Sequence, residues 1–143
     1  MRYVVEQADK IIDTVTICPE QIAQPALAWS IPNTKVWREE TRASINLLNQ
    51  TFCDSISSID EGWIVGSAGS FYAFVKHPFE GRSSKDVAMK MIEEAGVSCL
   101  PGCFFLPAEE EGKAGDRWLR FSVPNVSIEQ LKQVGERLKG LKM

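Results

Sequence analysis

The sequence predicts an α/β fold: a two-layer sandwich in which helices cover a small mixed or antiparallel sheet, preceded by a long helix of the interdomain type. Three observations predict it. The first 58 residues show helical spacing of apolar side chains almost throughout. After that point short strand patterns alternate with helical ones, in the order β-β-α-β-β-α. The two later helices each carry an apolar face, which must be buried against the sheet.

Three helices are predicted in the first part of the chain. Residues 3–15 place apolar side chains on one helical face and charges on the other. Pro19 suits the first turn of a second helix that ends near residue 32, although Pro25 would kink that helix or delay its start. Asn33 or Thr34 is a plausible cap for a third helix, which runs from residue 35 to about residue 56. A helix of about 20 residues spans about 30 Å, enough to connect two lobes of a larger protein.

The second part of the chain contains the predicted sheet. Ser83 or Ser84 should cap one helix, which Gly96 ends in a left-handed conformation, and Ser127 should cap the last helix together with Gln130. A turn is expected between the first two strands at residues 67–69, and a loop from Pro101. The predicted strands and helices are, in order, 62–66, 70–76, 85–95, 97–100, 117–123 and 127–141.

Composition excludes several classes of function. The formal net charge of −3 argues against a nucleic-acid or anionic membrane partner. No stretch approaches 18 consecutive apolar residues, so no membrane span is expected, and the N-terminus lacks the layout of a signal peptide. The cysteine spacing fits neither a disulfide framework nor a zinc site, so we expect reduced thiols packed as small apolar side chains in a cytoplasmic protein; they are Cys18, Cys53, Cys99 and Cys103.

Several short motifs, in a fixed order, resemble the C-terminal part of class I/II aminotransferases of fold type I. A segment at 18–26, Cys-Pro-Glu-x-x-Ala-Gln-x-Ala, is similar to the stretch that leads to the interdomain helix of that family. The later motifs are Gly69-Ser70-Phe71-Tyr72-Ala73-Phe74, a helix at 84–95, Gly96-Val97, Leu100-Pro101-Gly102-Cys103-Phe104-Phe105, and Trp118-Leu119-Arg120-Phe121-Ser122.

The resemblance implies a division of the chain and an activity. Residues 1–32 would be a remnant of the large domain, 33–58 the long connecting helix, and 59–143 the small domain. Enzymes of this family use pyridoxal 5′-phosphate (PLP) to transfer an amino group from an amino acid to a 2-oxo acid. Their Schiff-base lysine and most cofactor contacts precede the region that this chain resembles. We therefore expect a C-terminal portion that binds no PLP and is inactive by itself.

The resemblance also implies a substrate-carboxylate site at Arg120. A guanidinium offers a planar fork of donors that binds a carboxylate through two hydrogen bonds. The alternative for Arg120 is a surface strand arginine paired with an acidic side chain. Arg117 is expected to be an exposed charge at the start of the strand, after Gly115-Asp116. Tyr72 and Gly102 would line the pocket, although an aromatic strand residue is more often core and a Pro-Gly pair is often a plain turn.

Other titratable residues are given no catalytic role. Lys76 and Lys85 lie outside the lysine motif of the family and are rejected as Schiff-base lysines. His77, the one histidine, is expected in a surface loop. The acidic run at 109–111 is expected to be a solvated loop.

Two functions from other classes stay open. The chain could be a non-catalytic binding or oligomerisation module, and we expect a homo-oligomer because many apolar side chains would be left without a covering domain: Val4, Val5, Ile11, Ile12, Ile17 and Leu27. A ferredoxin-like small-molecule sensor ranks last, because its element order, β-α-β-β-α-β, differs from the predicted one.

Overall fold

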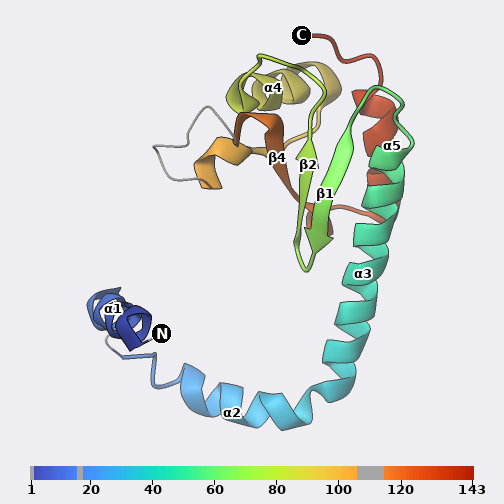
Figure 1. The fold of residues 1–143 in the computed structure, drawn as a ribbon. Coiled ribbons are helices and arrows are strands. Elements are labelled where there is room, and N and C mark those ends of the chain that lie inside the picture. The colour runs from blue at the N-terminus through green and yellow to red at the C-terminus, as the bar shows by residue number, and fades with distance from the viewer. Residues whose placement is uncertain (1, 16–17, 106–114) are drawn as a thin grey trace. The chain divides into compact units, whose positions relative to one another are not determined.

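The computed structural model describes residues 2–15, 18–105 and 115–143 (Figure 1). Ile17 and the acidic run at 109–111 therefore lie outside the described residues. Within the chain, residues pack into two units, Met1–Glu40 and Thr41–Met143.

The N-terminal unit is helical. It contains α1 (Arg2–Val15), α2 (Ala23–Asn33) and the first turns of α3 (Lys35–Ser57). The prediction for the first helix is confirmed, whereas α2 begins four residues after Pro19. Pro25 explains the late start, because it then occupies the first turn of α2, where a missing N–H breaks no helical hydrogen bond.

The junction between α2 and α3 differs from the predicted cap. Asn33 Nδ2 donates to the Trp29 carbonyl over 2.7 Å, and Thr34 Oγ1 donates to the Ser30 carbonyl over 2.7 Å. Both side chains therefore bond back to the end of α2 instead of capping α3. The Thr34 carbonyl does accept the first backbone bond of α3, from Arg38 N.

Apolar side chains of the N-terminal unit are exposed. No described residue of α1 or α2 is buried. The large apolar side chains that stand open to solvent in these helices are Tyr3, Val4, Val5, Ile11, Ile12, Val15, Leu27, Trp29 and Ile31. A row of this kind is typical of a surface that another segment or chain covers.

The C-terminal unit contains a four-stranded antiparallel sheet with the order β1-β2-β4-β3. One α-helix lies between β2 and β3 and another follows β4, so the predicted order β-β-α-β-β-α is confirmed. The bounds are β1 (Ile64–Gly69), β2 (Tyr72–Lys76), α4 (Ser84–Lys90) with a π-helical turn at Met91–Ala95, β3 (Leu100–Pro101), β4 (Trp118–Ser122) and α5 (Ile128–Leu138).

The helix caps of this unit agree with the sequence. Ser83 Oγ accepts from Asp86 N at the start of α4, and Gly96 ends the π-helical turn with a φ of 62°. Ser127 and Gln130 form the expected capping box of α5. The last helix is shorter than predicted, because it ends at Leu138.

Two strand predictions are wrong in their bounds. Residues 67–69 belong to β1, and the turn lies one step later at Ser70, whose φ is 50°. Asn49 of α3 supports this turn, because its Nδ2 donates to the Ser70 carbonyl over 2.8 Å. β3 has two residues and includes Pro101, which tolerates this edge position because it needs no ladder donor there.

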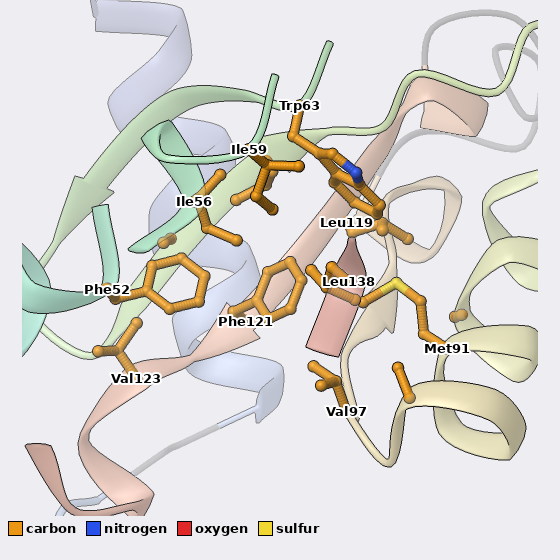
Figure 2. Close-up of a cluster of buried hydrophobic side chains, with 14 of the residues drawn as sticks. Phe52, Ile56, Ile59, Trp63, Met91, Val97, Leu119, Phe121, Val123 and Leu138 are labelled. Carbon is orange, nitrogen blue, oxygen red and sulfur yellow. The ribbon is translucent and has the colours of Figure 1, made fainter. Parts of the chain in front are cut away.

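One face of the sheet forms the core with α3, α4 and α5 (Figure 2). Alternate residues of β2 and β4 point into it, and Ala73, Val75, Leu119 and Phe121 are at most 4% exposed. The Phe52 ring of α3 packs on Phe121 with ring centroids 5.1 Å apart. Because side chains alternate along a strand, the residues between these four lie on the opposite face of the sheet.

A close contact joins α3 to α5. Ser55 Oγ accepts from Gly135 N over 2.8 Å and donates to the Lys132 carbonyl over 3.2 Å. A Cβ at Gly135 would overlap the Ser55 carbonyl oxygen. Glycine is therefore required here by the proximity of the two backbones.

We expect Gly135→Ala to lower the free energy of unfolding by about 2 kcal/mol or more, because a backbone must move to admit the methyl group. Chemical denaturation followed by circular dichroism measures the change. Gly69→Ala is the matched control, since no atom lies within 4 Å of the position that a Cβ would take there and no left-handed φ is involved. Equal stabilities of the two variants would contradict the close helix contact.

Candidate carboxylate-binding site

The second face of the sheet carries the sequence-predicted arginine. In the antiparallel register of β2 and β4, Phe74 pairs with Arg120, Tyr72 with Ser122 and Lys76 with Trp118. These six residues alternate with the buried ones, so they belong to the face opposite the core. We call this the open face of the sheet.

Arg120 lies between two aromatic rings. Its guanidinium carbon is 4.3 Å from the Tyr72 ring centroid and 4.2 Å from the Phe105 ring centroid, both within cation–π range. Tyr72 comes from β2, whereas Phe105 ends the short helical turn after β3 (Gly102–Phe105). The two rings therefore reach Arg120 from two separate segments of the chain. Phe74 packs edge-on against Phe105, with centroids 5.8 Å apart.

The polar groups of Arg120 find few partners within the described residues. Its Nε is buried there without a hydrogen bond, and no carboxylate of that part of the chain forms an ion pair with it. Arg117 differs: it lies 3.5 Å from Glu80 Oε1 and donates from Nη2 to the His77 carbonyl. Arg117 is thus a half-buried arginine bonded within the chain, which differs from the exposed charge expected there, whereas Arg120 retains donors for an external anion.

Glycine is required at position 102 because there is no room for a Cβ, and not because the backbone is left-handed. Its φ is not among the positive values of the described glycines. A Cβ there would lie 2.5 Å from the Trp118 carbonyl oxygen and 2.7 Å from that of Gly115. Gly102 lines an apolar pocket of about 400 Å³ together with Phe74, Phe105 and Trp118. It therefore adjoins Arg120 through the Phe105 ring.

A second pocket, of about 370 Å³, lies beside the short strand β3 and α5 and includes Cys99. Burial raises the pKa of the Cys99 thiol to about 12, so this thiol stays protonated and is a poor nucleophile. Cys103 is buried and Cys53 and Cys99 are half-buried, whereas Cys18 is exposed, so the prediction of packed thiols is wrong for Cys18. No cluster of metal-ligating side chains occurs within residues 2–15, 18–105 and 115–143.

His77 is fully buried, so the prediction of a surface loop is wrong. Its Nε2–H donates to the Asp116 carbonyl, and its ring stacks near Phe79. Burial lowers the pKa of His77, and Arg117 adds to this effect, although the bond to Asp116 opposes it. His77 therefore joins the end of β2 to the segment before β4. This role is structural and separate from that of Arg120.

The sequence missed the part that Phe105 plays. Phe105 belongs to the Pro-Gly motif, yet no role followed from its position in that motif. Its contact with Arg120 arises from two segments that are 15 residues apart and meet through β3 and β4 pairing. The one feature of the sequence that could have indicated this contact is the pair of aromatic residues, Phe104 and Phe105, after β3.

Comparison with known proteins gives one consistent result. The family model described as aminotransferase class I and II matches residues 2–138. An LL-diaminopimelate aminotransferase of Aquifex aeolicus (strain VF5) is 36% identical over 74 residues, which are 52% of this chain and 17% of that protein. In the residues that the structure describes, no helix is long and apolar enough to cross a membrane.

Solved structures share the fold. An aromatic aminotransferase from Pyrococcus horikoshii OT3 superposes with a TM-score of 0.67 at 25% identity, covering 95% of this chain and 35% of its own. The α-aminoadipate aminotransferase from Thermus thermophilus gives a TM-score of 0.70 at 16% identity, covering 99% of this chain and 36% of its own. The chain thus spans about a third of these solved proteins.

The buried His77 predicts a pH dependence of stability. Its folded pKa lies below the ordinary value of 6.5, so the unfolded chain binds a proton first as pH falls. The stability that neutral His77 contributes is present above about pH 6.5 and is lost as pH falls through that value toward the folded pKa. Urea denaturation at pH 7.5 and pH 5.5 should show a smaller loss for His77→Gln than for the original chain. Parallel losses would contradict a depressed pKa.

Proposed function

Because the chain belongs to the class I and II aminotransferase family, we propose that it supplies the substrate-carboxylate site of a PLP-dependent aminotransferase. Such an enzyme transfers an amino group from an amino acid to a 2-oxo acid, with PLP as electron sink. The observation that carries the proposal is Arg120, a cation on the open face with aromatic neighbours and no acidic partner in the described residues. The resemblance inferred from the motifs is confirmed by the family match.

The chemistry of Arg120 suits both substrates of that reaction. Amino acids and 2-oxo acids share an α-carboxylate, and a guanidinium binds a carboxylate through two parallel N–H···O bonds. A fixed carboxylate orients the adjacent carbon and so contributes to catalysis through positioning. Tyr72 and Gly102 would border this site, Tyr72 through its ring on Arg120 and Gly102 through the apolar pocket beside Phe105.

The residues of this chain do not fit the cofactor itself. A lysine that bonds covalently to PLP must lose its charge, which requires an enclosed or cationic setting. No lysine of the described residues is buried, and Lys85 is exposed, with its ammonium 5.5 Å from the Phe104 ring centroid. We therefore propose that another part of the protein binds PLP, and that residues 1–143 alone do not catalyse the reaction.

The division of the chain is part of the proposal. Residues 1–32 would belong with the large domain, 33–58 would connect the two domains, and 59–143 would form the small domain. The exposed apolar row of α1 and α2 supports this division, because a large domain would cover it. Four free cysteines, with no disulfide between them, support a cytoplasmic location.

A second candidate function is oligomerisation without catalysis. The same exposed row favours it, because a second copy could cover the apolar side chains of α1 as well as a large domain could. In that case the open face would be a remnant of the parent site. A homo-oligomer is the state that this candidate requires.

We expect Arg120→Gln to weaken the binding of pyruvate, a simple 2-oxo acid, by about 30-fold to 100-fold, since two charge-assisted hydrogen bonds are lost. Arg120→Lys should recover a small part of the affinity, because an ammonium lacks the planar fork. Saturation-transfer NMR on the 143-residue chain measures the binding. Arg117→Gln is the control and should bind pyruvate as the original chain does. Equal binding by all four proteins would contradict a carboxylate site at Arg120.

Light scattering of the pure chain at tens of micromolar tests the second candidate. The exposed side chains of α1 and α2 should drive self-association, which Val5→Glu combined with Ile12→Glu should reduce. Glu6→Gln is the matched control, because it changes an exposed polar residue of the same helix. A monomer in the original chain would count against oligomerisation as its function.

A further inference from the structure

Two aromatic rings, those of Tyr72 and Phe105, contact the Arg120 guanidinium. Tyr72 was expected near the site from the sequence, whereas Phe105 enters it only through the fold. A guanidinium has two flat faces and a rim that carries all its N–H donors. A ring that stacks on a face takes none of those donors.

We propose that Phe105 is a positioning residue for the carboxylate site: with Tyr72 it holds the Arg120 guanidinium by both faces, so that an anion can approach only the in-plane terminal N–H rim. The inference rests on the proposed function of Arg120. It concerns how the guanidinium is held and which approach remains, and it assigns Phe105 no contact with the substrate.

The first support is the position of the rings. Both centroids lie at nearly equal distances from the guanidinium carbon, 4.3 Å for Tyr72 and 4.2 Å for Phe105. Tyr72 lies on β2, whereas Phe105 ends the helical turn after β3, so the two rings reach Arg120 from different segments. Phe105 is itself held edge-on by Phe74, whose backbone pairs with Arg120. The ring therefore has a fixed support on the open face.

The second support is the state of the donors. Nε is enclosed and has no hydrogen-bond partner in the described residues, although Arg120 as a whole is only half-buried. The exposed part of the residue thus lies away from Nε. Because Nε is enclosed and no acidic side chain of the described residues pairs with Arg120, the donors that remain for a ligand are those of the terminal Nη groups.

Holding the arginine in place has an energetic consequence. A free arginine side chain loses considerable rotamer entropy when it binds a carboxylate. Stacking on both faces restricts the guanidinium before the ligand arrives, so less entropy is lost on binding. Removal of one ring should therefore weaken carboxylate binding even though every N–H donor is retained.

The test uses the 143-residue chain and sodium acetate as the probe, with sodium chloride at equal ionic strength as the reference. The Nε–H signal of Arg120 in a ¹H–¹⁵N spectrum is assigned by its loss in Arg120→Lys. Ring currents of stacked aromatics should shift this signal upfield, and acetate bound at the Nη groups should change its position in a concentration-dependent way. Phe105→Leu should reduce the upfield shift and weaken acetate binding by about threefold to tenfold, the range expected for one cation–π contact.

Three variants make the result specific. Phe105→Tyr keeps the ring and should restore both the shift and the affinity. Tyr72→Leu should resemble Phe105→Leu. Phe104→Leu removes the neighbouring ring, which contacts Lys85 and not Arg120, and should leave both readouts unchanged. Thermal unfolding of each variant identifies any loss that comes from misfolding alone.

Two outcomes would overturn the inference in different ways. If the original chain binds acetate and Phe105→Leu binds it equally well, the positioning role of Phe105 is wrong while the carboxylate site stands. If acetate leaves the Arg120 signal of the original chain unmoved, although the upfield shift is present, then the carboxylate site is wrong and the inference built on it fails too.

Discussion

The burial of one face of the sheet is the constraint on which the site depends. Phe121 and Leu119 of β4 are enclosed by Phe52 of α3 and by the helices of the C-terminal unit (Figure 2). Since side chains alternate along a strand, burying these two residues directs Arg120 between them to the opposite face. A slip of one residue in the register would bring the arginine into the core, at a large cost in desolvation. The core therefore specifies where the candidate site lies.

Two long-range hydrogen bonds from side chains of α3 join this helix to the rest of the C-terminal unit. Asn49 bonds to the Ser70 carbonyl in the turn between β1 and β2, and Ser55 bridges to α5 at Gly135. Both partners lie far away in the sequence, so they link the start of the C-terminal unit to its middle and its end. The helix thus supports the strand that carries Tyr72, and Tyr72 in turn flanks Arg120.

The sequence predicts much of this fold and less of the site. Helical and alternating spacing suffices for the order of the elements, and local chemistry marks the helix ends at Ser83, Gly96 and Ser127. Such local rules fail at residues 67–69, where small residues resemble a turn but continue β1. They also fail at His77, because burial depends on chain segments that meet only after folding. Arg120 is recognisable from a short motif, whereas the stacking of Phe105 depends on the two-residue strand β3, whose pairing with β4 no spacing rule predicts.

Under the proposed function, this chain would hold the substrate carboxylate of an aminotransferase, and the lysine that bonds to PLP would lie elsewhere in the protein. The most direct test is incubation of the chain with PLP, reduction with borohydride and peptide mapping of the modified lysines. We predict scattered, substoichiometric labelling of exposed lysines and no transaminase turnover. Stoichiometric labelling of a single lysine such as Lys76 or Lys85, with turnover, would contradict the account.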